Sequence, residues 1–168
     1  MTSDEQKLIL SLAAKSRHKD EFLRRFRQSN DGAKLTSELL NEAIASRDAD
    51  DVEMALLVGF SFGFTDQHLT ALKLLESVDW HARHEDVVSA LDDLKSGSAV
   101  EALYHATQWG PEYLKFDKSR ALAVKAIWAL GKIEGAAAED KLRQLAKEEN
   151  PILRENAEKQ IERRRNKD

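Results

Sequence analysis

The sequence predicts an all-α chain, in which paired helices stack into an α-α superhelix of about ten helices. Apolar residues recur at three- and four-residue spacing almost throughout the 168 residues. Proline and glycine number only 2 and 7, too few for the many turns of a β-rich fold. The sequence also repeats itself at intervals of 34 to 39 residues. A single helical hairpin cannot bury its apolar face alone, so such repeats stack on their neighbours.

Helices are expected over residues 3–16, 20–28, 35–46, 51–62, 65–78, 86–94, 99–108, 119–133, 137–147 and 151–165. A capping box at residues 3–6 opens the first helix. The helix over 51–62 is apolar nearly all round and should be the most buried. Gly59 and Gly63 allow close approach of a neighbour or mark the end of that helix. Asn150 caps the last helix, with Pro151 at its first position.

The repeat is visible at two offsets along the sequence. At an offset of 39, residues 90–107 overlie 129–146, so that Ala90, Leu91, Leu94, Ala99 and Leu103 match Ala129, Leu130, Ile133, Ala138 and Leu142. At an offset of 34, Arg120, Ala123 and Ile127 match Arg154, Ala157 and Ile161. Periods of this length with two helices each are typical of helical-repeat proteins.

Residues 126–133, followed by Ala137 and Leu142, resemble the HEAT-like repeat of the bilin-lyase type. In that repeat, Gly131 ends the first helix, and residues 150–154 resemble the start of the next repeat. The resemblance is good over 115–165 and moderate over 85–110. It implies one domain, residues 1–168, with HEAT-like pairs over 51–165 and residues 1–47 as an N-terminal helical cap. It implies a scaffold rather than a specific activity.

Composition and charge narrow the class of protein. Hydrophobic residues make up 42% and charged residues 33%, which is typical of neither a disordered nor a membrane chain. No apolar run approaches the ~20 residues that cross a bilayer, so no membrane partner is expected. The absence of cysteine favours the reducing cytoplasm and excludes thiolate chemistry. Residues 48–101 hold 12 acidic and 3 basic residues, which suits a basic partner and opposes nucleic acid. These acids could equally be solvated helix faces.

The segment 80–86 most resembles a chemical site. His81 and His84 can share one helical face, with Glu85 and Asp86 to complete a metal site. The alternative is a turn in which Trp80 packs and both histidines form local hydrogen bonds. The pair His84-Glu85 resembles one of the iron-binding pairs of deoxyhypusine hydroxylase, a HEAT-like enzyme. The matching positions here hold Arg120-Ala121 and Arg154-Glu155, so a di-iron site is not expected.

A long loop over residues 109–117 contributes three aromatics, Trp109, Tyr113 and Phe116, to the rim of the stack. Aromatics on a loop over a rigid scaffold are good anchors for a partner, although they could also fold back over the helix ends. Trp128 lies on a regular apolar face and is expected in the core. HEAT-like base-excision glycosylases need a basic, aromatic-lined groove, which the acidic centre opposes. The basic residues 163–165 complement the dipole of the last helix or touch an anionic partner.

The sequence therefore predicts a protein-binding module rather than an enzyme, with no cofactor and no metal. The expected contact set is Trp80, Asp86, Asp92, Asp93, Trp109 and Tyr113. The most specific hypothesis is a cytoplasmic bacterial immunity protein, an antitoxin that neutralises a basic toxin domain such as a nuclease. Two alternatives stay open: a metal-dependent enzyme using His81 and His84, and a chromophore-handling scaffold of the bilin-lyase sort.

Overall fold

The computed structural model describes residues 1–14 and 18–166, and this part of the chain is all-α, with no strand. The ten α-helices are α1 (Ser3–Ala14), α2 (Lys19–Arg25), α3 (Gly32–Ser46), α4 (Ala49–Phe62), α5 (Leu69–Ser77), α6 (His84–Leu94), α7 (Val100–Gln108), α8 (Ala121–Lys132), α9 (Ala136–Leu145) and α10 (Pro151–Arg165). Three short 3-10 helices, η2 (Asp66–His68), η3 (Gly97–Ala99) and η4 (Glu112–Leu114), lie between them. None of the described helices combines the length and apolar composition needed to cross a bilayer.

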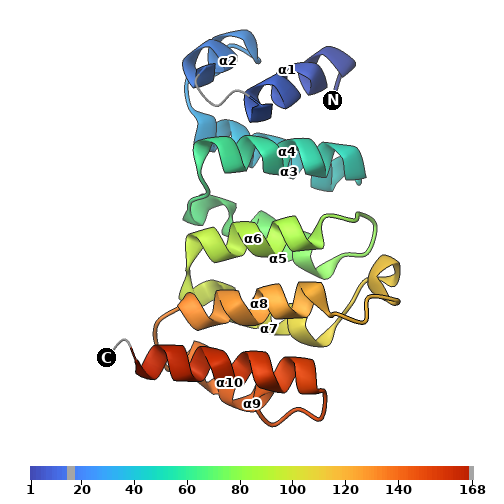
Figure 1. The fold of residues 1–168 in the computed structure, drawn as a ribbon. Helices are drawn as coiled ribbons and strands as arrows, with labels where there is room; N and C mark the ends of the chain where they lie inside the picture. Colours follow the sequence, from blue (N-terminus) through green and yellow to red (C-terminus); the bar gives the residue numbers. More distant parts are fainter. Residues whose placement is uncertain (15–17, 167–168) are drawn as a thin grey trace.

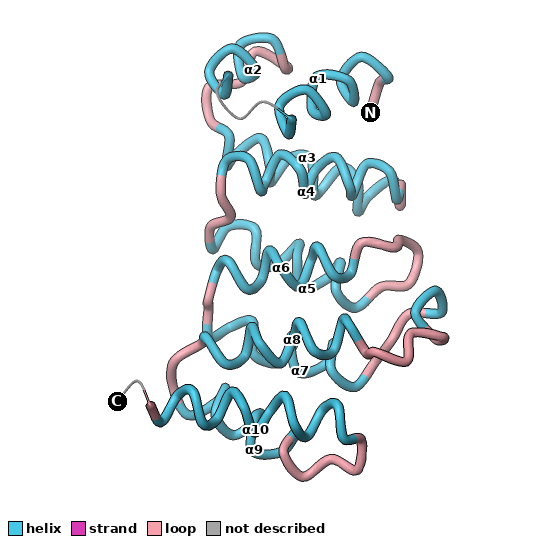
Figure 2. The backbone as a smooth tube through the Cα atoms, in the orientation of Figure 1, coloured by secondary structure: helices cyan, strands magenta, loops and turns pink. Residues whose placement is uncertain are grey.

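The helices are arranged in layers of two (Figure 1). From the N-terminal end the layers are α1 with α2, α3 with α4, α5 with α6, α7 with α8, and α9 with α10. The α5–α6 and α7–α8 loops emerge on one side of the stack, and the α6–α7 and α8–α9 turns lie on the other (Figure 2). The predicted division between residues 47 and 51 falls in the turn between α3 and α4, and it stays a prediction.

The helix pairs that form layers in the structure are shifted by one helix from the pairs that the sequence repeat suggests. The resemblance pairs α8 with α9, because only a short turn separates them. In the structure α8 packs more extensively against α7, although twelve residues separate these two helices. The same helix also packs against α6 and α10 in the adjacent layers. The packing of small and apolar faces, rather than loop length, therefore decides which helices share a layer.

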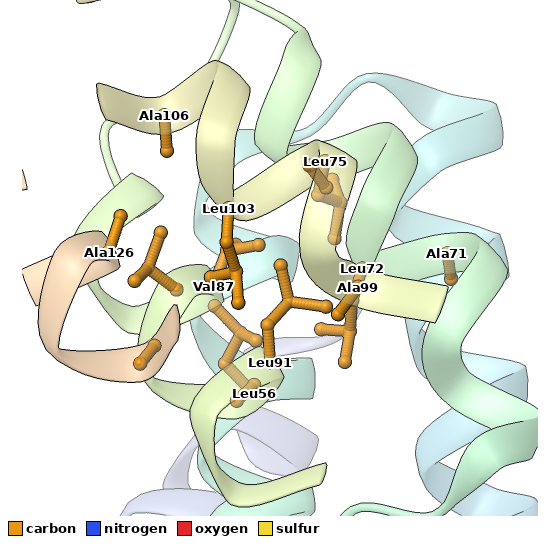
Figure 3. Close-up of a cluster of buried hydrophobic side chains, with 14 of the residues drawn as sticks. Leu56, Ala71, Leu72, Leu75, Val87, Leu91, Ala99, Leu103, Ala106 and Ala126 are labelled. Carbon is orange, nitrogen blue, oxygen red and sulfur yellow. The ribbon is translucent and has the colours of Figure 1, made fainter. Parts of the chain in front are cut away.

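One hydrophobic core runs continuously from Ile9 to Ala157. Around α6 and α7 it brings together side chains from α4, α5, α6, α7 and α8, including Leu72, Leu91 and Leu103 (Figure 3). Positions that match at the offset of 39 are buried alike, except that Leu94 is only partly buried. The four other matched pairs are each at most 1% exposed: Ala90 and Ala129, Leu91 and Leu130, Ala99 and Ala138, Leu103 and Leu142. The sequence repeat is thus also a repeat of buried positions.

Glycines mark close approaches between helices, as predicted. A Cβ atom on Gly131 would lie 2.4 Å from Oε1 of Gln160, so α8 and α10 approach closely there. A Cβ on Gly59 would lie 2.3 Å from the ring of Phe64. Gly63 ends α4 with a φ of 93°, a left-handed conformation that favours glycine. Gly131 itself lies inside α8, one residue before the helix ends.

Several helix ends differ from the predicted positions. The capping box of α1 is formed by Thr2 and Glu5, one residue earlier than predicted, because each side chain accepts the backbone N–H of the other. Asp31 accepts two backbone N–H groups, so α3 begins at Gly32. Asn150 caps α10 as predicted. The predicted end of the first helix, at Ser16, lies outside the described residues.

Two predictions about burial are wrong. Trp128 is 37% exposed rather than in the core, and it packs against polar groups of α10: its ring lies under the guanidinium of Arg163 and its Nε1 donates to Asn156. On α4, Phe60 is 41% exposed, so this helix is not buried all round. The basic end of α10 has a structural role, since Arg164 donates to carbonyl groups in the α8–α9 turn.

Replacing a core leucine should destabilise the whole stack. Leu103 is fully buried where α5, α6 and α7 meet, so Leu103→Ala should lower the free energy of unfolding by about 3 kcal/mol. Leu74→Ala is the matched control, because Leu74 is 46% exposed and should change stability little. Urea denaturation followed by circular dichroism measures both. Equal losses in the two variants would contradict this description of the core.

Candidate functional site

An aromatic and imidazole cluster occupies one edge of the stack, where the α5–α6 and α7–α8 loops emerge (Figure 2). It consists of Trp80, His81, His84, Trp109 and Tyr113, here called the rim cluster. Three of its members belong to the contact set predicted from the sequence. The fold brings them together because two loops 29 residues apart leave adjacent layers on the same side.

The rings of the rim cluster form a continuous series of contacts. His81 and His84 are stacked, with ring centroids 4.3 Å apart and an interplanar angle of 15°. Trp80 meets the ring of His81 edge-on at 5.2 Å. Trp109 meets the ring of His84 at 5.3 Å, and Tyr113 lies 5.7 Å from it. His84 is therefore the centre of the cluster.

Both histidines donate hydrogen bonds to carbonyl groups at the end of α5. Nε2 of His81 donates to the carbonyl of Leu75 at 2.9 Å, while its Nδ1 accepts the backbone N–H of Arg83 at 3.0 Å. Nε2 of His84 donates to the carbonyl of Val78 at 2.6 Å, and its Nδ1 accepts the hydroxyl of Tyr113 at 3.1 Å. The last carbonyls of a helix have no partner within the helix, and a buried one must find another. The histidines supply that partner.

This geometry opposes the metal site considered from the sequence. All four ring nitrogens of His81 and His84 are already bonded, and the two Nε2 atoms carry protons. Glu85 pairs with Lys125, and Asp86 lies 3.9 Å from Arg83. Across the described ranges, no three His, Asp or Glu side chains are placed to share a metal ion. The turn in which the histidines bond locally, the alternative stated above, is what the structure contains.

Burial keeps these imidazoles neutral. It lowers the pKa of His84 to about 4, with a smaller lowering contribution from His81 beside it. Burial likewise lowers the pKa of His81. Two protonated rings stacked 4.3 Å apart would repel each other without water to screen them. Burial also raises the pKa of the Tyr113 hydroxyl.

The loop beyond Trp109 presents aromatic surface to solvent. Tyr113 is 44% exposed although its hydroxyl bonds His84, and Phe116 is 84% exposed. The sequence places both rings at the rim, but the expected contact set includes only Tyr113. The loop is tied down at both ends, because Tyr113 is bonded to His84 and Asp117 accepts the backbone N–H of Ala121 at 2.7 Å. The exposed rings are therefore held on a fixed loop.

Two further residues at this edge escaped the sequence analysis. The carboxylate of Glu76, with its side chain 2% exposed, accepts a hydrogen bond from Nδ1 of His105 at 2.9 Å. The His105 ring stacks on Trp109 at 5.4 Å. These two residues lie 29 positions apart on α5 and α7, and no sequence spacing signals such a pair.

The predicted acidic contacts divide into two places. Asp86 lies in the first turn of α6, beside the rim cluster, whereas Asp92 and Asp93 lie at the opposite end of that helix. Six of the twelve acids in residues 48–101 form ion pairs with described residues of the same chain, and a seventh, Glu76, accepts the hydrogen bond from His105. Three of these pairs share one spacing of 40 residues: Glu85 with Lys125, Asp92 with Lys132, and Glu101 with Lys141. Much of the acidic charge therefore joins neighbouring layers.

Comparison with protein-family models, with curated proteins and with solved structures finds no match to this chain. A functional conclusion must therefore be drawn from its own residues.

The buried His84 should make stability depend on pH. Its folded-state pKa of about 4 lies below the ordinary 6.5, so the folded state binds fewer protons than the unfolded state. Stability is then full above pH 6.5 and declines as the pH falls towards 4, by about 3 kcal/mol for this group. His84→Gln keeps a donor for the Val78 carbonyl but does not titrate, so its stability should fall less over this range. Urea denaturation at several pH values measures the difference, and parallel profiles would contradict it.

Proposed function

We propose that this chain is a protein-binding module of HEAT-like helical pairs, which binds one partner through the rim cluster and the loop beyond it. In its most specific form it is a bacterial immunity protein, which binds a basic toxin domain in the cytoplasm and blocks its active site. The immunity role rests on analogy with other small, acidic, cysteine-free helical antidotes. The binding role rests on the geometry of the rim.

The observation that carries the proposal is the exposed aromatic surface on a fixed loop. Phe116 is 84% and Tyr113 44% exposed, and the loop that holds them is hydrogen-bonded to the buried His84 and to the backbone N–H of Ala121. Large aromatic side chains dominate the binding energy of many interfaces. A loop that is already ordered loses little conformational entropy when a partner binds. Such a loop on a stack of helices has the features of a preorganised binding site.

Two equivalent arginines support the HEAT-like description. Arg120 and Arg154 match at the offset of 34, and both donate to upstream backbone carbonyls, Arg120 to one in the last turn of α7 and Arg154 to two in the turn after α9. Arg120 bonds the carbonyl of Thr107 at 2.8 Å, and Arg154 bonds those of Glu148 and Glu149 at 3.1 and 3.2 Å. Matched positions thus hold arginines that bond backbone carbonyls in two successive layers, although Arg120 precedes α8 and Arg154 lies within α10.

The charge of the partner follows from the acids that remain free of ion pairs. Asp93 is exposed and has no ion-pair partner within the described residues, in contrast to Asp92 beside it. Asp79, also exposed, lies next to Trp80 at the rim. The chain as a whole carries a net charge of −4. These acids favour a basic partner and would steer its approach, while the aromatic rings would supply most of the affinity.

The partner should be lost when the exposed rings are removed. Affinity capture of the tagged full chain from its native cells, followed by mass spectrometry, would identify one abundant basic protein. Phe116→Ser should then weaken binding of that protein by about 30-fold, in the range of an interface hot spot. Leu74→Ser is the matched control, because Leu74 is an exposed apolar residue on α5 outside the rim cluster. An empty capture, or equal binding by both variants, would count against the proposal.

Charge reversal at the end of α6 should distinguish an acid that attracts the partner from an acid that stabilises the fold. Asp93→Lys should slow association with the basic partner and reduce its salt dependence, without lowering stability. Asp92→Lys should lower the free energy of unfolding as well, because it places two lysines together at Lys132. Association kinetics at two salt concentrations, with urea denaturation, measure both effects. An unchanged on-rate for Asp93→Lys would exclude this end of α6 from the approach of the partner.

A further inference from the structure

The Glu76–His105 pair is a carboxylate and an imidazole in a defined geometry. Both oxygens of Glu76 lie within hydrogen-bond distance of Nδ1 of His105, at 2.9 and 3.1 Å. The Glu76 side chain is 2% exposed, whereas that of His105 is 45% exposed. The carboxylate is thus buried, and the imidazole in front of it is exposed to solvent.

This contact selects one tautomer of His105. Burial raises the pKa of Glu76, and the hydrogen bond with His105 opposes that rise. The ionised carboxylate accepts hydrogen bonds, so Nδ1 of His105 then carries the proton, and in the neutral ring Nε2 carries the lone pair. No described residue hydrogen-bonds Nε2 of His105. The stacked indole of Trp109, with an interplanar angle of 21°, restricts rotation of the ring. The lone pair is therefore oriented and available.

The other four histidines differ from His105. His68, His81 and His84 are buried, and each uses both ring nitrogens in hydrogen bonds. His18 is exposed, with its Nδ1 3.7 Å from an exposed carboxylate of Glu21. Only His105 combines an exposed ring with a buried carboxylate behind it. His18 is thus a natural reference for an ordinary surface imidazole in the same chain.

We propose that His105 is a nucleophilic site that accepts an acyl group from activated esters and related acyl donors, with Glu76 as its positioning residue. This inference does not depend on the proposed binding function. It rests on the orientation of the ring and on the position of the buried carboxylate.

The chemistry follows from the charges. Nε2 attacks the carbonyl carbon of the donor, the bond from that carbon to the alcohol oxygen breaks, and the alcoholate leaves with the bonding pair. The ring, now acylated on Nε2 and still protonated on Nδ1, carries a positive charge, which the carboxylate of Glu76 stabilises at 2.9 Å. Water then adds to the acyl carbon, the bond from that carbon to Nε2 breaks, and the carboxylic acid departs with one proton of the water. The other proton passes by way of Nε2 to the alcoholate, which becomes the alcohol, and neutral His105 is regenerated. In sum, ester and water give acid and alcohol.

The test is site-resolved acylation of the full chain. Diethyl pyrocarbonate would be applied at a pH above 8, where an ordinary imidazole, with a pKa of about 6.5, is neutral. Peptide mass spectrometry then gives a rate for each histidine. We expect His105 to react several-fold faster than His18, and the three buried histidines to react slowest. Release of p-nitrophenolate from p-nitrophenyl acetate, compared between the wild type and His105→Asn, gives a second readout.

The Glu76→Gln variant distinguishes an activated imidazole from a merely exposed one. The amide of glutamine can donate to Nδ1, which would move the ring proton to Nε2 and remove the lone pair from the surface. The rate at His105 should then fall to that of His18 or below, while the rate at His18 stays unchanged. Circular dichroism confirms that the variant is folded. Equal rates at His105 and His18 in the wild type, or an unchanged rate at His105 in Glu76→Gln, would overturn the proposal.

Discussion

The close packing of α8 within the stack is the constraint on which most of the structure depends. This helix contacts α6, α7, α9 and α10 at once, which is possible because small residues line its faces. Ala123, Ala126 and Ala129 are each at most 3% exposed, and Gly131 leaves no room for a Cβ beside Gln160. Larger side chains at these positions would separate the layers and expose apolar area on both sides. The continuity of the core follows from this helix.

The buried polar groups of the rim cluster follow from a second constraint: the carbonyl groups at the end of α5 need hydrogen-bond donors. A helix that stops inside the stack leaves carbonyl groups that water cannot reach. His81 and His84 meet this need, and their mutual stacking places His84 against Trp109 and Tyr113. The same residues that complete the helix end thus position the loop that presents the exposed rings. The proposed binding role would therefore use residues that also have a structural role.

The ion pairs give the acidic centre of the chain a structural role. Pairs at a spacing of 40 residues connect α6 with α8 and α7 with α9 across adjacent layers. Each such surface pair contributes little on its own, yet together they neutralise acids that would otherwise repel each other. The acids outside these pairs are the ones that the proposed function assigns to the approach of a partner. The net charge of a segment is therefore a poor measure of the field that its surface presents.

The sequence by itself determined the helical class, the repeat and the positions of the core. Helical periodicity and small residues at matched positions are local or regularly spaced signals, and the buried leucines and alanines of α6 to α9 bear them out. The tertiary structure alone decided which helices share a layer, how exposed Trp128 is, and that Glu76 contacts His105. Each depends on which faces meet across layers. Such contacts join residues about 30 positions apart, and their free energy comes from packing and burial that no single segment of the sequence contains.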